Sequence, residues 1–246
     1  MENSKISVTH LKKNFGKLEV LKGISLEVKE GEVVCLIGPS GSGKSTFLRC
    51  LNRLEKITAG EVIVDGHPIS DPNVNINKVR ENIGMVFQHF NLFPNMTIKK
   101  NITLAPTQLG LMSKEDADKK ALELLERVGL LDKADSYPDM LSGGQKQRLS
   151  IARAIAKKPE IFIFDDSFSA LDFKTDSTLR KALKEHTKDA TTIIVAQRIS
   201  TILNADKIIV LDDGHMAGIG THGELMKNCE VYRQIAMSQL SEEELA

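Results

Sequence analysis

The chain has 246 residues, of which 41% are hydrophobic, so it is long enough for one large domain with a sizeable core. Lysine plus arginine and aspartate plus glutamate each total 33, which gives a formal net charge of zero. Polyanion-binding proteins carry a basic excess, and charge-dominated disordered chains carry a large net charge. The balance therefore argues against both classes.

No segment has the pattern of a membrane anchor or a secretion signal. The longest apolar runs, such as 33–37 and 161–164, are far shorter than the roughly 20 residues that span a bilayer. The first residues lack the apolar centre of a signal peptide. Cys35, Cys50 and Cys229 do not have the spacing of a disulfide framework or a zinc site. These features predict a soluble, cytoplasmic, globular protein.

The first part of the chain is predicted to be rich in strands. Alternation of polar and apolar residues at 5–11 and 24–28 is typical of half-exposed strands, whereas the almost wholly apolar stretch 32–37 predicts a strand buried on both faces. An amphipathic helix is expected at 47–54, and further strands are expected at 61–65 and 83–87.

The rest of the chain alternates between helical and strand patterns. Apolar residues at helical spacing predict a helix over 114–128, within a helical lobe over 94–140. Beyond this lobe we expect helices at 144–157 and 175–186, strands at 161–165, 191–196 and 207–211, a hairpin ending at Gly220, and two further helical segments.

This order predicts an α/β fold with a mainly parallel sheet, a β-rich N-terminal portion and an inserted helical lobe. We expect one domain over 1–246, with a core formed by 1–93 and 141–246 and the lobe by 94–140.

A glycine-rich turn carries the strongest chemical signal. Gly38, Gly43, Lys44 and Ser45 match the P-loop pattern, and they lie between a buried strand and a helix, as that motif requires. Glycines let backbone N–H groups converge on phosphate oxygens, while the helix N-terminus adds positive charge. Lys44 is expected to reach the β- and γ-phosphates, and Ser45 to ligate Mg²⁺. The candidate nucleotide-binding residues of this loop are Gly38, Ser40, Gly41, Ser42, Gly43, Lys44, Ser45 and Thr46.

A second element is the apolar run that ends at Asp165. A carboxylate at the end of a buried strand can hold the water shell of Mg²⁺ beside bound phosphates. The two elements together predict a P-loop NTPase, and they leave kinases, GTPases, helicases and transport ATPases open.

A third motif narrows this choice. Leu141-Ser142-Gly143-Gly144-Gln145, just before a predicted helix, resembles the signature motif of the ATP-binding cassette (ABC) family. Gln88 is placed like the family's Q-loop glutamine, and 169–172 resembles its D-loop. Phe15 lies where the family has an aromatic residue that stacks on adenine. The resemblance spans residues 5–228, with every motif in the family's order.

The resemblance implies a dimer of cassettes packed head to tail, either a homodimer or a heterodimer. Each ATP would lie between the P-loop of one cassette and the Ser142, Gly143, Gly144 and Gln145 of the other, and hydrolysis to ADP and phosphate would separate them. The family's glutamine at the position of Gln88 takes part in both catalysis and Mg²⁺ binding. Membrane permease subunits are the implied partners, at the inner face of the cell membrane. Nucleic acid is not expected.

Two positions depart from the family's catalytic pattern. Asp166 stands where the family usually has a glutamate that polarises the attacking water, so the carboxylate is withdrawn by about 1.5 Å. Misplacement by about 1 Å can lower the rate on the order of a hundredfold. Gln197 replaces the family's switch histidine, and an amide cannot exchange a proton near neutral pH.

The two changes resemble the degenerate site of heterodimeric exporters, and they predict firm binding of Mg-ATP with slow hydrolysis. One alternative is that both are harmless variants with normal turnover. Another is that the chain is an ATP-dependent dimerisation module without useful turnover. A soluble ABC protein of DNA repair or translation is a third class, but such proteins usually carry coiled-coil insertions or tandem cassettes.

The two halves resemble different branches of the family. Up to Leu141 the chain is similar to importer cassettes for polar amino acids, as at 47–52 and 84–94. From Ser142 onward it is similar to multidrug-exporter cassettes, as at 144–153 and 195–201. This contrast favours a recombined or engineered chimera with a join near the signature motif. The alternative is a natural cassette intermediate between the two branches.

Overall fold

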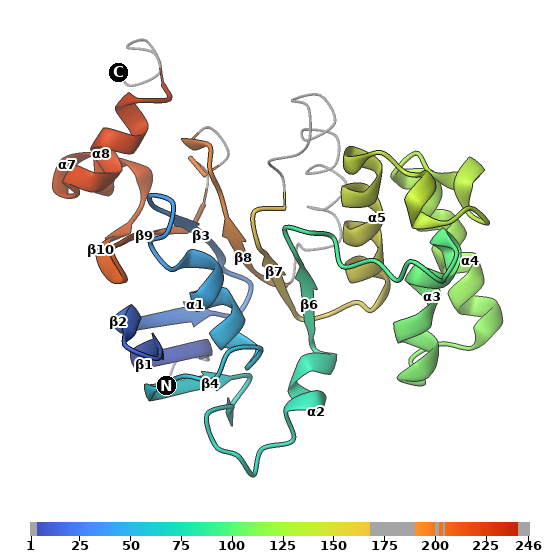
Figure 1. Ribbon diagram of the computed structural model, residues 1–246, viewed down its shortest axis with the longest axis horizontal. Helices are drawn as coiled ribbons and strands as arrows, with labels where there is room; N and C mark the ends of the chain where they lie inside the picture. The colour runs from blue at the N-terminus through green and yellow to red at the C-terminus, as the bar shows by residue number, and fades with distance from the viewer. Residues whose placement is uncertain (1–3, 168–189, 200–201, 204, 241–246) are drawn as a thin grey trace. The chain divides into compact units, whose positions relative to one another are not determined.

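The computed structural model describes residues 4–167, 190–199, 202–203 and 205–240 (Figure 1). The chain forms two compact units, Met1–Arg80 with Thr191–Ala246 and Glu81–Ala190. We refer to them as unit 1 and unit 2. The helix predicted at 175–186 and the motif at 169–172 lie outside the described residues.

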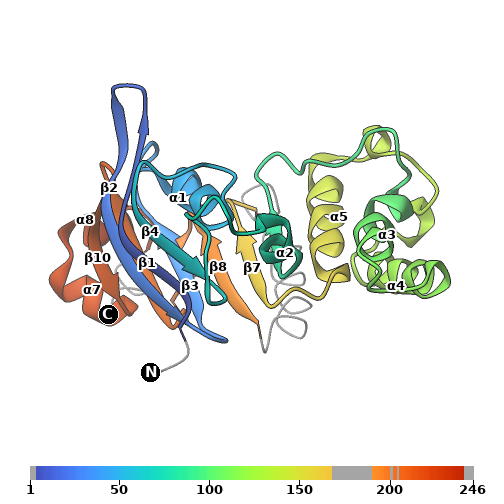
Figure 2. The ribbon, with the colours of Figure 1, turned by 90° about the horizontal axis from the view of Figure 1, so that it is seen from below.

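Unit 1 contains an antiparallel sheet with the strand order β2-β1-β4-β5. Its strands are β1 (Ser4–Phe15), β2 (Leu18–Lys29), β4 (Ala59–Val64) and β5 (His67–Pro68). The predicted alternation is confirmed in β1, where Ile6, Val8 and Leu11 are buried. Both β1 and β2 are longer than predicted because backbone pairing continues to Phe15 and Leu18, beyond the buried side chains. Figure 2 shows the resulting long hairpin.

The second sheet of unit 1 is built around β3 (Val33–Ile37). This strand pairs in parallel with β8 (Thr191–Val195) on one side and β9 (Lys207–Asp212) on the other. β10 (His215–Gly220) continues antiparallel from β9, which confirms the predicted hairpin. The strand order within this unit is β10-β9-β3-β8.

Helices of unit 1 follow these strands. α1 (Lys44–Leu51) starts three residues earlier than predicted, directly after the glycine-rich loop, and α2 (Ile76–Glu81) is short. α7 (His222–Asn228) and α8 (Glu230–Met237) follow β10 (Figure 1). Their buried side chains form one apolar cluster with strand and loop residues, namely Leu225, Cys229, Tyr232, Ala236, Cys35, Ile37, Ala196, Ile199, Ile202, Ile208 and Val210.

Unit 2 combines a strand pair with a group of helices. β6 (Ile83–Val86) pairs in parallel with the fully buried β7 (Ile161–Phe164). The helices are α3 (Ile98–Gln108), α4 (Lys114–Arg127) and α5 (Gly143–Ala156), with short 3-10 turns at Leu131–Lys133 and Pro138–Met140. As predicted, α4 buries its apolar face, and α5 packs against both α3 and α4 (Figure 1).

The elements confirm the predicted α/β architecture, with a β-rich N-terminal portion, mainly parallel pairing elsewhere and a helical lobe. Among the residues that the structure describes, no helix has both the length and the apolar character needed to cross a bilayer. The three cysteines are buried, and burial raises the pKa of the Cys50 thiol to about 12. This favours a packing role for Cys50 over a reactive one.

A half-buried lysine beside β6 makes the stability of the chain depend on pH. Lys157 Nζ donates a hydrogen bond to the Ile83 carbonyl at 2.6 Å, and burial lowers the pKa of Lys157 to about 8, against a smaller opposing effect of Glu81. Because this pKa lies below the ordinary 10.5, the unfolded chain binds more protons between the two values, and stability rises with pH across that window.

We expect the free energy of unfolding to increase by roughly 1–2 kcal/mol between pH 7.5 and 9.5, relative to the change in Lys157→Gln. Urea unfolding of both proteins at the two pH values measures this difference. If the free energy of unfolding changed with pH by the same amount in the parent and in Lys157→Gln, the lowered pKa of Lys157 would be contradicted.

Candidate functional site

The loop between β3 and α1 can be built only with glycine at two of its positions. Gly38 and Gly43 have φ of 153° and 98°, which L side chains rarely adopt. A Cβ at Gly38 would collide with the Leu211 carbonyl oxygen, and one at Gly43 would lie 2.7 Å from Leu21 Cδ2. The loop therefore rests directly on β9 and β2, and backbone groups line it.

Lys44 lies across this loop. Its Nζ donates to the carbonyl oxygens of Gly38 at 2.8 Å and Pro39 at 2.7 Å, and it lies 3.4 Å from Ser42 Oγ. No side chain caps α1, and its first turn contains no acidic residue. The positive end of the helix therefore faces the loop beside a fixed ammonium group, which is an arrangement that suits an anion.

The structure brings the predicted loop residues together in unit 1. Ser42 is buried, Ser40 and Gly41 are exposed, and Ser45 and Thr46 are half-buried in the first turn of α1. Their hydroxyl and backbone groups lie at the carboxyl end of β3, where ligands of parallel sheets bind.

Gln197 lies at the same sheet edge. The Ala196 N–H donates to the Leu36 carbonyl at 3.1 Å, so β8 stays paired with β3 up to the residue before Gln197. Gln197 is exposed, and its carbonyl accepts a hydrogen bond of 2.8 Å from Gln239 Nε2. None of the sequence motifs predicted this contact, because the residues around Gln239 give it the pattern of an ordinary surface glutamine.

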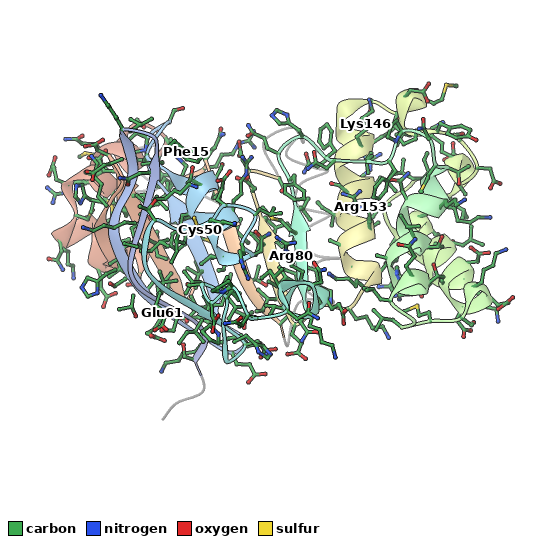
Figure 3. The ribbon with its side chains drawn as sticks, turned by 60° about the horizontal axis from the view of Figure 1, so that its bottom comes forward. Phe15, Cys50, Glu61, Arg80, Lys146 and Arg153 are labelled. Atoms are coloured by element: carbon green, nitrogen blue, oxygen red, sulfur yellow. The ribbon has the colours of Figure 1, made fainter. Side chains whose placement is uncertain are left out.

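Phe15 ends β1 and is labelled in Figure 3. It is 45% exposed, and Lys13 Nζ lies 4.3 Å from the centroid of its ring. Lys13 is itself held by Glu55, with 3.0 Å between Nζ and Oε2. The ring is therefore available for stacking beside a fixed cation.

The two carboxylates of unit 2 follow β7 directly. The Asp165 N–H donates to the Val86 carbonyl at 2.9 Å, and the residue is fully buried. Asp166 has a φ of 48° and is 9% exposed. Ser167 Oγ also donates to the Val86 carbonyl at 2.9 Å and ties the loop to β6, a contact that the sequence analysis missed. Asp tolerates the left-handed region better than Glu, so the path of this backbone suits the residue at 166.

Gln88 belongs to the same end of this strand pair. It follows β6 and is exposed, while Asp165 follows the parallel neighbour β7, and Val86 pairs with Phe164. The two side chains therefore start from one edge of the pair.

A half-buried arginine fixes the path of the chain after Gln88. Phe90 and Asn91 have φ of 62° and 47°. Arg153 on α5, labelled in Figure 3, donates to the Phe90 carbonyl at 2.9 Å and to the Asn91 carbonyl at 2.6 Å. Burial lowers the pKa of Arg153, although a guanidinium stays charged in proteins. Sequence reasoning missed this anchor because its partners are backbone atoms some 60 residues away.

The candidate Mg²⁺ ligands are Ser45 in unit 1 and Gln88 and Asp165 in unit 2. Their donors are a hydroxyl, an amide and a carboxylate, and such hard oxygen ligands fit Mg²⁺, which binds through few side chains and keeps water and phosphate oxygens. The described residues contain no cluster of three or more His, Cys, Asp or Glu side chains that would hold a metal by itself.

The signature motif forms the start of α5. The Gln145 N–H donates to Ser142 Oγ at 3.4 Å, and Gln145 Oε1 accepts from the Ser142 N–H at 2.9 Å, so the two residues form a capping box. The side chain of Gln145 thus caps the N-terminus of its own helix, α5. No acidic residue occupies the first turn of α5, whereas α4 has Glu115 and Asp116 there.

Gly143 is not required by the fold. Its φ is not in the left-handed region, and a Cβ at this position would meet no described atom within 4 Å. Because Gly143 has no side chain, the backbone N–H groups at the start of α5 remain open to an approaching anion. The D-loop candidate at 169–172 is outside the described residues.

Known proteins resemble this chain over most of its length. A family model described as ABC transporter matches residues 21–169. The glutamine transport ATP-binding protein GlnQ of Geobacillus stearothermophilus is 48% identical, over 83% of this chain and 85% of its own. The arginine transport ATP-binding protein ArtM of Bacillus subtilis is 48% identical over 221 residues, 89% of this chain and 92% of its own.

A solved structure shares the fold. The ATP-binding cassette MJ0796, in a dimeric post-hydrolysis state with ADP and Pi, superposes with a TM-score of 0.82 at 37% identity, covering 88% of this chain and 98% of its own. The comparisons do not support a join near the signature motif, because the 221 residues aligned with ArtM must include both sides of Leu141.

Proposed function

The chain belongs to the ABC transporter family, and we propose that it is the ATP-binding subunit of an importer for polar amino acids, with slow ATP hydrolysis. The observation that carries the import function is the similarity to GlnQ and ArtM at 48% identity over most of each chain. Both relatives serve polar amino acids by name. The partners would then be permease subunits, with the chain peripheral at the inner face of the cell membrane.

The phosphate groups of ATP are proposed to bind at the loop of unit 1. Lys44 supplies a positioned cation, the start of α1 supplies N–H groups, and Phe15 supplies a ring for adenine. Ser45, Gln88 and Asp165 are proposed to hold Mg²⁺, which when bound would neutralise phosphate charge.

The second anion site is proposed to act on the nucleotide of another cassette. Neither the conformation of Gly143 nor its packing against described residues requires glycine, so an atom from outside the chain has room to approach the helix N-terminus. The dimeric state of MJ0796 supports such an arrangement. The other cassette could be a second copy or a different chain.

Hydrolysis is proposed to be slow because of Asp166 and Gln197. The carboxylate at 166 is short, and an amide replaces an imidazole at 197. These two positions also favour a second candidate function, an ATP-dependent dimerisation module without useful turnover. The rate of hydrolysis separates the two candidates.

Exposed apolar side chains on unit 2 support docking to a membrane partner. Among the described residues of this unit, Met140 is 72% exposed, Leu111 51%, Tyr137 48% and Phe93 45%. A contiguous exposed apolar patch marks a surface that contacts another protein, and we propose that these side chains contribute to such a patch.

Import is tested by replacement of a relative. In Bacillus subtilis cells that lack ArtM, expression of this chain is expected to restore uptake of radiolabelled arginine, while Lys44→Ala, which removes the loop cation, is expected not to. Absence of uptake despite normal expression, together with no binding to the permease subunits, would contradict the import function.

Steady-state hydrolysis of Mg-ATP tests the catalytic departures. We expect the double variant Asp166→Glu/Gln197→His to hydrolyse ATP at least about tenfold faster than the parent, with unchanged ATP binding, because the carboxylate reaches farther and an imidazole returns. The φ of 48° at 166 should cost the Glu variant a little stability. A slow rate that the double change does not raise, with ATP still bound, would favour the dimerisation module.

The two glycines at open positions of helix first turns make a matched pair for testing the signature site. Gly143→Ala is expected to stabilise the isolated chain by up to about 0.5–1 kcal/mol, because Ala favours helix, yet to lower ATP hydrolysis at least about tenfold. Gly223→Ala, in the first turn of α7 with equally open space, should gain similar stability and keep full hydrolysis. Equal hydrolysis in both variants would rule out a ligand role for Gly143.

A further inference from the structure

The segment that follows β8 is held by a side chain from the far end of the chain. Gln239 Nε2 donates to the Gln197 carbonyl at 2.8 Å, and Gln239 Oε1 accepts from the Ile199 N–H at 2.9 Å. One amide thus binds two main-chain groups on either side of Arg198. All of these residues belong to unit 1.

Gln239 is itself placed by the end of α8. The N–H groups of Gln239 and Leu240 donate to the Ala236 carbonyl at 3.0 and 2.9 Å, which forms a tight turn after the helix. Ile199 is fully buried in the apolar cluster that contains Tyr232 and Ala236 of α8. Apolar packing therefore fixes the Ile199 side chain, and the Gln239 amide fixes the adjoining main chain.

This pair of hydrogen bonds holds the main chain from which the Gln197 side chain departs. When a carbonyl is held, the peptide plane cannot rotate freely, and the Cα–Cβ bond of the same residue keeps its orientation. The preceding residue is fixed as well, because the Ala196 N–H is bonded to the Leu36 carbonyl of β3. Gln197 is thus constrained from both sides, by β3 before it and by Gln239 after it.

We propose that Gln239 is a positioning residue that aims Gln197 at the γ-phosphate. The inference rests on the proposed function, in which Gln197 takes the place of the switch histidine. It also makes the turn after α8 part of the catalytic apparatus, although this turn contains none of the candidate nucleotide-binding residues.

The test removes the amide of Gln239 and keeps a side chain of similar length. Gln239→Met is expected to speed amide hydrogen exchange at Ile199 by about three- to tenfold and to lower kcat for Mg-ATP by a similar factor, because both hydrogen bonds are lost. ATP affinity and the melting temperature should stay close to those of the parent. The matched control is Gln234→Met on the exposed face of α8. The amide of Gln234 donates to Glu230 Oε1 of the same helix, and the substitution should change none of these quantities.

A double-mutant cycle separates positioning from a general structural role. In a Gln197→Ala background there is no side chain to aim, so Gln239→Met should speed exchange at Ile199 and leave kcat unchanged. An equal loss of kcat in both backgrounds, or a loss that follows the melting temperature, would overturn the positioning role. Unchanged exchange at Ile199 would overturn the clamp itself. If the parent chain binds no ATP, the proposed function fails and the positioning role fails with it, whereas the exchange measurement still reports on the clamp.

Discussion

The parallel pairing of β3 with β8 and β9 is the constraint on which the described site of unit 1 depends. Leu36 is paired with both Val195 and Ile209, so three chain segments reach the same edge in register. From that edge β3 continues into the glycine-rich loop and β8 continues to Gln197. A slip of one residue in either pairing would turn buried side chains outward and would separate the loop from Gln197. The apolar runs that form these strands thus position the chemistry that follows them.

Much of this arrangement could be predicted from the sequence, since its signals are local. The apolar stretches predicted β3, β7, β8 and β9 to within one or two residues, and the glycine spacing predicted the loop. The structure adds why the glycines are needed, because the clash at Gly38 involves the Leu211 carbonyl, which is distant in sequence. Helix α1 began earlier than predicted because its first residues, Lys44 to Thr46, are polar and carry no apolar periodicity.

Anchors that bind backbone atoms could not be predicted. Arg153, Ser167 and Gln239 each hold a carbonyl of a segment remote in sequence, and any residue type can supply a carbonyl. Their partners therefore leave no pattern. The left-handed backbone at Asp166 is a further example, since it depends on the path of the loop after β7. This backbone conformation favours Asp over Glu at position 166, and the shorter carboxylate that results is the proposed cause of slow hydrolysis.

The ammonium group of Lys44 is already positioned before any ligand arrives, because it donates to two carbonyl oxygens of its own loop at 2.7 and 2.8 Å. Ordering a free lysine side chain costs up to about 2 kcal/mol of rotamer entropy, and here that cost falls on folding instead of on binding. When a phosphate binds, its oxygens replace the Gly38 and Pro39 carbonyl oxygens as acceptors for the Lys44 ammonium group, which is already in place. The loop is in this sense a preorganised receptor, and its preference for anions is established when the chain folds.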